Sequence, residues 1–437
     1  MKGLADLGLD QRRGERPLSD SLKDEPDVLV VGAGVVGVST AYALAVRGRR
    51  VAVIDAGQVG AGSSYGNAGL IVPSHSLPLA MPGVIGQGLR WMLDPESPFY
   101  IKPRLDRALL SWLLKFRAAA TEKKARRAAP VLGGLLRASR EMYDDWSSLA
   151  GADCAYETKG AMYLYRTAKG LAEGRHEIEM MAEAGLQPRV LDGREVRDLV
   201  PQIRPGMAGG IVFPEDAHLE PHSFVLGLAR HAERSGAVFF DNAEALGFET
   251  SGRKVTRVRT TRGDVHPNQV VLATGAWTPA VARDLDLRIP IEAAKGYSLT
   301  FRRPDPCPEL PVLLQEAKVG VTPMGPYLRF AGTLELAGID FSINQRRVDA
   351  IRRGPPDYFE GMDDLELVEI WRGLRPCTPD GLPIVGASGT WENLILAAGH
   401  ATIGMSLGPV TGEIVAQLAC GETPEFDLEP LAPGRFE

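Results

Sequence analysis

The chain has 437 residues, of which 44% are hydrophobic and 24% charged, and 49 basic against 55 acidic side chains leave a net charge of −6. This balance is typical of a globular protein of two or three domains, and the small acidic excess argues against a nucleic-acid-binding surface. The four cysteines form no C-x-x-C pair and no histidine lies at metal-ligand spacing from them, so we expect a reducing compartment and no metal site.

No run of about 18 apolar residues predicts a membrane-spanning helix. Residues 1–26 are polar and lack the apolar core of a signal peptide, so we expect a mobile N-terminal tail. These features predict a cytoplasmic protein.

The first ordered elements form a βαβ unit. An apolar strand over 27–31 is followed by a helix over 35–47, which Gly48 ends, and by a second strand over 51–54. The Gly-, Ser- and Pro-rich segment 57–83 that comes next is typical of a long functional loop.

Further elements follow in chain order. Apolar positions at helical spacing predict a helix over 105–116, and another is expected over 128–146. Later strands are expected at 161–165, 238–240, 255–259, 270–273, 297–301, 328–331 and 394–397, with a last helix over 409–419.

A glycine fingerprint lies in the first turn of the βαβ unit. Gly32, Gly34 and Gly37 form G-x-G-x-x-G directly after the strand, and Asp55 ends the second strand, 23 residues after Gly32. The glycines permit the tight turn, a close approach of a pyrophosphate and close packing of helix on strand. The helix N-terminus attracts phosphate, and Asp55 can accept hydrogen bonds from a ribose.

The fingerprint is compatible with NAD and with FAD. Its place at the very start of the folded chain favours FAD, as does a distant buried strand that ends in Thr274 and Gly275. The fold class predicted is mixed α/β and α+β, with a discontinuous Rossmann-type FAD-binding domain and a discontinuous, β-rich substrate domain. We expect the FAD-binding domain to comprise 27–90, 205–285 and 365–437, and the substrate domain to comprise 91–204 and 286–364.

Several longer segments resemble one family. They are VVGAGVVGVSTAYALA (30–45), SSYGNAGLIVP (63–73), the proline-rich approach to LRWML (77–93), KGYSLT (295–300), WRGLRPCTPDGLPIVG (371–386) and AAGHATIGMSLGPVTG (397–412). Through them the chain resembles the D-amino-acid oxidase superfamily of FAD-dependent oxidoreductases, most closely the bacterial D-amino acid dehydrogenases, from residue 27 to about residue 421.

The resemblance implies that FAD is bound without a covalent bond, because relatives with covalent flavin carry a Cys where this chain has Gly373. Many relatives also carry Gly at the position of Ala401. The fingerprint and the resemblance together place against FAD the residues Gly32, Gly34, Val35, Val36, Gly37, Asp55, Ala56, Ser63, Ser64, Asn67, Ala68, Gly69, Leu70, Ala245, Thr274, Gly275, Gly399, His400, Ala401, Thr402 and Ile403.

The resemblance also implies a substrate site. Arg375 corresponds to the arginine that binds the substrate α-carboxylate, a task that suits a planar, always charged guanidinium. Tyr297 and Tyr327 are candidates for the same pocket or for half-buried strand aromatics. His400 is either structural or a neighbour of the flavin, and Lys295 is either a solvated charge or an active-site cation.

The expected reaction is oxidation of a D-amino acid, including the D-proline or hydroxyproline type, by hydride transfer from Cα to flavin N5. The likeness to the dehydrogenases implies that the electrons pass to a quinone or another acceptor than oxygen, and it suggests peripheral membrane contact through 77–112. Two alternatives stay open: an oxygen-using oxidase of the glycine or sarcosine type, and a flavoprotein subunit of a larger amine dehydrogenase. The oligomeric state is open too.

Overall fold

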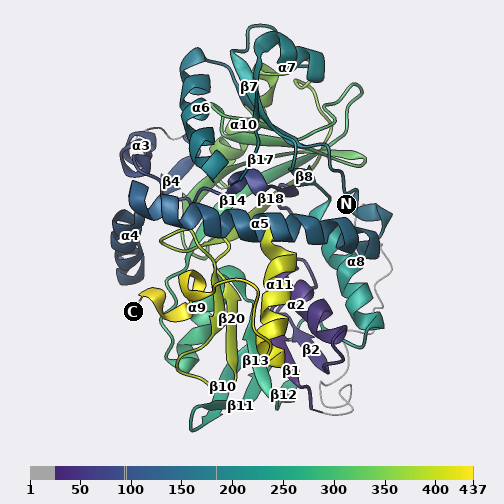
Figure 1. Cartoon of the computed structure of the whole chain (residues 1–437), viewed down its shortest axis with the longest axis vertical. Helices are drawn as coiled ribbons and strands as arrows, with labels where there is room; N and C mark the ends of the chain where they lie inside the picture. The colour runs from purple at the N-terminus through teal and green to yellow at the C-terminus, as the bar shows by residue number, and fades with distance from the viewer. Residues whose placement is uncertain (1–24, 93, 95, 184, 437) are drawn as a thin grey trace.

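The computed structural model describes residues 25–92, 94, 96–183 and 185–436 (Figure 1). The predicted tail over 1–26 therefore lies almost wholly outside the described residues. Two sheets, one at each end of the long axis, form the two halves of the molecule, and the helix α5 (Glu122–Ala150) runs across the middle of the view.

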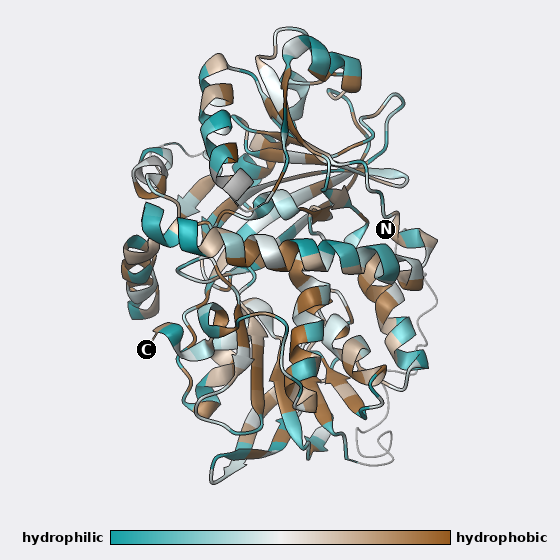
Figure 2. Ribbon diagram, viewed as in Figure 1, coloured by the Kyte–Doolittle hydropathy of each residue, from teal (hydrophilic) through white to brown (hydrophobic). Residues whose placement is uncertain are grey.

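The smaller half is built on a six-stranded sheet. Its order is β19 (Ile384–Ala387), β20 (Leu394–Ala398), β13 (Gln269–Leu272), β1 (Val28–Val31), β2 (Val51–Ile54) and β9 (Val238–Phe240). All neighbours pair in parallel except β19 and β20. Because both faces of the parallel strands are covered, β1 and β2 are continuous apolar runs, which Figure 2 shows as brown strands.

Helices cover one face of this sheet and a small meander covers the other. The helices α2 (Val35–Ala45), α8 (Pro221–Arg234) and α11 (Gly404–Cys420) share one apolar core with α5. The second core lies between the sheet and the meander of β10 (Ala245–Ser251), β11 (Lys254–Thr260) and β12 (Gly263–Val265). This arrangement is the predicted Rossmann-type layer.

The larger half contains a nine-stranded mixed sheet. Its path runs through β18 (Leu367–Cys377), β14 (Glu292–Arg302), β17 (Tyr327–Leu336), β16 (Val319–Met324), β15 (Val312–Leu314), β5 (Ala161–Tyr165), β7 (Gly209–Phe213) and β6 (Arg189–Asp192), and β4 (Phe99–Ile101) pairs with β17. Outside these two sheets and the meander, the structure has the strand pair β3 (Leu70–Ile71) and β8 (Ala217–His218). It also has the α-helices α3 (Val84–Trp91), α4 (Arg107–Ala119), α6 (Ala168–Glu183), α7 (Gly193–Leu199), α9 (Thr278–Val281) and α10 (Gln345–Arg353).

Two strands and one helix lie elsewhere than the predicted domain boundaries put them. The strands β7 and β18 belong to the nine-stranded sheet, although 205–285 and 365–437 were assigned to the FAD-binding domain. The helix α5 packs against α8 and α11, although 91–204 was assigned to the substrate domain. Apolar runs show that a strand or a helix is buried, but not which partner buries it. The division of the chain into domains stays a prediction.

Most predicted elements exist, and their ends differ for local reasons. The helix predicted over 105–116 begins at Arg107, because the Asp106 side chain caps it by accepting hydrogen bonds from the N–H groups of Ala108 and Leu109. The helix predicted over 128–146 begins at Glu122, behind the cap of Thr121. The helix predicted over 35–47 ends at Ala45.

The last helix begins five residues before the predicted start at Pro409. A proline usually lies in the first turn of a helix, because it has no N–H to give to the carbonyl four residues earlier. Here that carbonyl belongs to Met405, and the Tyr143 hydroxyl of α5 donates to it at 2.5 Å. A side chain far away in the sequence thus replaces the missing backbone hydrogen bond.

A buried carboxylate joins the loop after β3 to the segment before β8. Asp216 is fully buried and accepts hydrogen bonds from the Ser74 N–H at 3.0 Å and the Ser74 hydroxyl at 2.6 Å. Within the described chain no basic side chain forms an ion pair with it. Burial therefore raises the pKa of Asp216 from 3.8 to about 7.

This shift predicts a pH-dependent stability. The folded protein holds the Asp216 proton more tightly than the unfolded chain does. The contribution of this proton to the unfolding free energy therefore declines as pH rises above the unfolded pKa of 3.8, and it is lost once pH passes the folded pKa of about 7. Between about pH 5 and pH 8 the wild type should lose roughly 2–3 kcal/mol of unfolding free energy relative to Asp216→Asn, which keeps the acceptor for Ser74 N–H but cannot ionise. Urea unfolding of both proteins across this range measures the difference, and parallel curves would contradict it.

Candidate active site

The turn between β1 and α2 has the shape that a dinucleotide fingerprint requires. Gly32 has φ +106°, and a Cβ on it would lie 2.5 Å from the Ala273 carbonyl oxygen at the end of β13. A Cβ on Gly37 would lie 1.8 Å from the Gly32 oxygen, so α2 packs on its strand only because this position is glycine. Thr274 and Gly275 come next in the chain after Ala273, and the same Cβ on Gly32 would lie 3.3 Å from the Thr274 Cα, which places this segment beside the turn.

Asp55 follows β2 and faces the same turn. One carboxylate oxygen accepts the Ala33 N–H at 2.7 Å and the other accepts the Gly57 N–H at 2.8 Å. Ala56 is the next residue, and the Asp55 carbonyl accepts the Ala243 N–H at 2.7 Å, two residues before Ala245 begins β10. The carboxylate is thereby held in place, with lone pairs left to accept from a ribose hydroxyl.

The N-terminus of α2 has no side-chain cap of its own. Gly34 is the N-cap residue, and the Ser64 hydroxyl from the following loop accepts the Val35 N–H at 3.0 Å. Val36 and Gly37 complete the first turn, where N–H groups and the positive end of the helix dipole favour a phosphate. The turn therefore fits a pyrophosphate with its ribose beside Asp55.

A cavity of about 1520 Å³ continues from this region between the two sheets, and most of its lining is apolar. Seven of the residues predicted to contact FAD line it: Ser63, Asn67, Ala68, Leu70, Ala401, Thr402 and Ile403. Gly69 and Gly399 lie in the same two loops with positive φ and shape their backbone without lining the cavity. The sequence-predicted flavin loops therefore meet on one wall of one cavity.

Arg375 reaches this cavity from β18. Its guanidinium donates to the Thr333 carbonyl oxygen at 2.7 Å, and no carboxylate among the described residues lies within 4.0 Å of it. Burial lowers the pKa of this guanidinium, although an arginine stays charged at pH 7. An unpaired cation in a mostly apolar cavity favours the binding of an anionic group.

The strand opposite makes room for this guanidinium. Gly296 of β14 lies beside it, and a Cβ there would be 1.9 Å from the Arg375 Nη1 atom. On the next strand, the pairing of β14 with β17 shifts by one residue between Lys295–Glu335 and Tyr297–Gly332. Thr333 lies in this bulge with φ +67°, and the irregular backbone turns its carbonyl toward Arg375.

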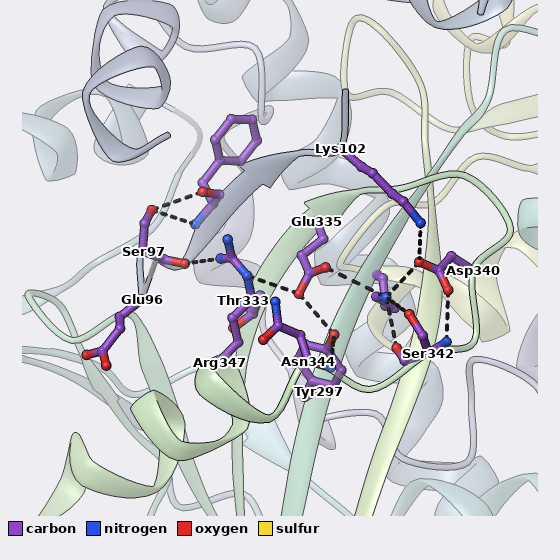
Figure 3. A network of polar contacts seen from close by, with 12 residues as sticks. Glu96, Ser97, Lys102, Tyr297, Thr333, Glu335, Asp340, Ser342, Asn344 and Arg347 are labelled. Carbon is purple, nitrogen blue, oxygen red and sulfur yellow. Dashed lines mark hydrogen bonds and ion pairs between the residues drawn. The ribbon is translucent and has the colours of Figure 1, made fainter. Parts of the chain in front are cut away.

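A buried polar network holds the bulge from the opposite face of β14 (Figure 3). Glu335 lies between two cations, with Arg347 Nε at 3.2 Å and Lys295 Nζ at 3.7 Å, and it accepts the Tyr297 hydroxyl hydrogen at 2.9 Å. Lys295 also pairs with Asp340 at 3.2 Å. The opposite charges compensate one another, which a buried charge requires.

Lys295 and Tyr297 therefore do not present their polar ends to the cavity. The Lys295 ammonium is committed to Asp340, Glu335 and Ser342. Tyr297 contributes to the lining, but its hydroxyl donates to Glu335 and accepts the Asn344 N–H at 3.1 Å. Burial raises the pKa of this hydroxyl well above its usual range.

The other two candidate residues lie outside the cavity lining. Tyr327, at the start of β17, packs under the Arg302 guanidinium at 5.6 Å from its ring centre. His400 is buried, and its Nε2 shares a 3.0 Å hydrogen bond with the Thr411 hydroxyl of α11. Burial lowers the pKa of His400 to about 4, so the ring is neutral at pH 7 and anchors the loop to α11.

Several residues of the cavity were not found from sequence. Thr333 accepts a hydrogen bond from Arg375, and Gly296 leaves space for its guanidinium. The position of Thr333 depends on a strand bulge that no local sequence pattern predicts. Trp371 packs where Cβ atoms on Gly66 and Gly373 would lie, which explains both glycines. His75 and Tyr163 line the far wall, with ring centres 6.1 Å apart.

Ala401 adopts φ +46°, a left-handed conformation that glycine adopts more readily. Its N–H donates to the Pro376 carbonyl at 2.9 Å, which joins the loop to β18 near Arg375. Over the described residues, no group of three or more His, Cys, Asp or Glu side chains is arranged to hold a metal ion.

The chain is similar to known proteins in sequence and in fold. Residues 27–418 match the DAO family, described as FAD dependent oxidoreductase. The chain is 33% identical to the D-amino acid dehydrogenase of Granulibacter bethesdensis over 94% of this chain and 99% of that protein, and 34% identical to that of Methylobacterium radiotolerans over 94% and 99%.

Among solved structures, glycine oxidase from Geobacillus kaustophilus has a TM-score of 0.75 and 23% identity, with 94% of this chain and 98% of that chain covered. The L-proline dehydrogenase from P. horikoshii has a TM-score of 0.73 and 20% identity, over 95% and 98%. These two likenesses concern the fold. With the fingerprint turn, the flavin loops and the match over most of its length, the chain belongs to the DAO family of FAD-dependent oxidoreductases.

Proposed function

We propose that this enzyme oxidises D-amino acids and passes the electrons to a quinone or another acceptor than oxygen. The observation that carries the proposal is Arg375, a buried cation without a carboxylate partner in the described chain, which lies in the cavity that the flavin loops line. An α-amino acid supplies the missing carboxylate. The preference for the D form rests on the names of the relatives.

The residues of the chain bind and orient the substrate. The guanidinium of Arg375 binds the carboxylate, and the Thr333 carbonyl keeps one of its N–H groups aligned. The apolar walls exclude water, which strengthens this ion pair. When bound, FAD supplies the acceptor for the hydride that leaves the substrate Cα. Fixed orientation of this kind can supply a large part of the reduction in the activation barrier.

We assign the pyrophosphate of FAD to the N-terminus of α2 and its ribose to Asp55. The flavin end is assigned to the loops of Asn67 and Ala401. Arg375 is the catalytic residue in contact with substrate, whereas Tyr297 and His400 are assigned structural roles by their buried hydrogen bonds.

The proposed substrates are D-amino acids with a side chain or ring, including D-proline, and the names of the relatives support a D-amino acid rather than glycine. The alternative is an oxidase of glycine or sarcosine that uses oxygen. It stays open because the chain shares its fold with a glycine oxidase, at 23% identity. A third alternative is a flavoprotein subunit that needs a partner. The described residues include no helix long and apolar enough to cross a bilayer, so we propose that contact with a membrane quinone is peripheral, on the cytoplasmic face.

Anaerobic bleaching of the flavin absorbance tests the substrate class. D-amino acids or D-proline should bleach the FAD-loaded protein, whereas the L forms should not. Oxygen uptake during aerobic turnover should stay far below turnover with a dye acceptor. Rapid bleaching by glycine or sarcosine with matching peroxide formation would favour the oxidase instead, and no bleaching at all would favour a subunit that requires a partner.

Replacement of Arg375 tests its proposed role in binding the substrate carboxylate. Arg375→Ala should lower kcat/KM for the best substrate by roughly 10²- to 10³-fold, since a buried charge pair contributes about 2–5 kcal/mol. The variant should also bind a competitive carboxylate such as benzoate more weakly, by a similar factor, as measured by the change in flavin absorbance. The matched control is Arg372→Ala on the same strand, because that guanidinium faces Phe341 rather than the cavity. Equal losses in the two variants would remove Arg375 from its assigned role.

Non-covalent binding of FAD is expected because position 373 is Gly, and because burial raises the pKa of Cys377, the cavity-lining cysteine nearby, to about 12. A protonated thiol is a poor nucleophile. Acid precipitation should therefore release all the flavin into the supernatant, and flavin absorbance that stays with the protein pellet would reject this expectation.

A further inference from the structure

The outer surface of α3, α4 and the segment between them exposes an unusual number of large apolar side chains. We call it the α3–α4 surface and define it by Ile85, Met92, Leu105, Leu110 and Leu114. Leu110 and Leu114 are 60% and 59% exposed on one side of α4, and Leu105 is entirely exposed before it. The two helices lie at the same edge of the molecule (Figures 1 and 2).

The opposite face of α4 explains why these leucines stay outside. Leu109 and Trp112 point inward and are buried, and the Trp112 indole N–H donates to the Cys377 carbonyl at 2.9 Å. The helix is therefore held in one rotation, with Leu110 and Leu114 outward. Large apolar side chains exposed together on neighbouring elements favour a binding surface.

Basic side chains border this surface, on α4 and on the first turns of α5, which follows α4 directly in the chain. Residues 102–127 contain nine Lys or Arg and two Asp or Glu, a net charge of +7 in a chain whose total is −6. Arg107, Arg117, Lys123 and Arg127 are exposed and have no carboxylate within 4.0 Å in the described part of the chain. Apolar side chains framed by long cationic ones are the pattern of a helix that lies at the surface of an anionic bilayer.

The cavity opens at this surface. Ile85, Met92, Leu114 and Arg117 line it, and each is also exposed to solvent or partly so. The mostly apolar cavity therefore extends from Arg375 and the flavin loops to the α3–α4 surface. A molecule that comes from the hydrocarbon region of a bilayer would reach the site without crossing water.

We propose that the α3–α4 surface docks on a bilayer that contains anionic lipids, with α4 parallel to the membrane, and that a lipophilic electron acceptor enters the cavity between α3 and α4. The entrance route rests on the proposed function, whereas the docking does not. A second copy of the chain fits the surface less well, because a twofold contact would bring the same excess of positive charge against itself.

The docking is tested by sedimentation of the FAD-loaded protein with vesicles. The protein should bind vesicles that contain phosphatidylglycerol, should not bind vesicles of phosphatidylcholine alone, and should be released by salt. Arg107→Gln with Lys123→Gln should lower the partition constant roughly 30-fold (about 2 kcal/mol), at about 1 kcal/mol for each charge. Leu105→Ser with Leu110→Ser should lower it at least roughly tenfold.

Matched controls lie on α7 and β10, outside the surface. Arg194→Gln with Arg197→Gln removes two exposed cations, and Leu199→Ser with Leu246→Ser removes two leucines of 48% and 53% exposure. These variants should bind vesicles as the wild type does. Absence of binding to anionic vesicles, or an equal loss in the control variants, would overturn the docking. So would a leucine variant that dissociates a dimer in size-exclusion chromatography while vesicle binding stays unchanged.

Turnover measurements with two electron acceptors distinguish the entrance route of the lipophilic acceptor from the proposed function. With a soluble dye, all four variants should oxidise the D-amino acid like the wild type, because none of the changed residues lines the cavity. With a long-chain quinone in the vesicles, only the two α3–α4 variants should lose turnover, in proportion to their lost binding. Full quinone turnover by an unbound variant would overturn the route. A wild type that binds anionic vesicles but oxidises no amino acid with either acceptor would sink the proposed function and leave the docking intact.

Discussion

The geometry of the site depends on one buried guanidinium that has no carboxylate partner among the described residues. Holding Arg375 in an apolar cavity is costly, and the 2.7 Å hydrogen bond to the Thr333 carbonyl compensates only part of that cost. The rest is left for an anionic ligand to offset. Gly296 gives the guanidinium its space, and the bulge of β17 gives it its acceptor. The ion network of Glu335 stabilises that bulge from the other face of the sheet (Figure 3).

The strand that carries Arg375 also connects the two halves of the molecule. β18 is an edge strand of the nine-stranded sheet, and at Cys377 it bridges to His400 in the loop before α11. The Ala401 N–H donates to Pro376, and the Ser63 hydroxyl donates to Leu374 at 2.6 Å. Both loops that are predicted to contact the flavin are thus hydrogen-bonded to the strand that carries Arg375, so direct hydrogen bonds link the proposed substrate and cofactor positions.

The cavity combines two chemical environments. Near Arg375 it offers a cation and backbone acceptors, which suit an amino acid, and toward α3 and α4 it is lined by apolar side chains, which suit a lipophilic molecule. One cavity could therefore serve a polar donor and an apolar acceptor of electrons. The basic segment 102–127 lies at the apolar end.

The sequence by itself determined the βαβ unit, the glycine turn with Asp55 and the strands of the nucleotide sheet, because each depends on residues close together in the chain or on a motif of several adjacent positions. The carboxylate-binding role of Arg375 stays a prediction that the family resemblance implies. Tertiary structure alone decided which way Lys295, Tyr297 and His400 point, that Tyr327 lies elsewhere, that β18 joins the larger sheet, and that α11 continues through Pro409. In each of these cases the deciding partner lies far away in the chain. Burial and hydrogen bonding to such a partner outweigh local preference, since an unpaired polar group inside the protein costs more free energy than a change of rotamer or helix boundary.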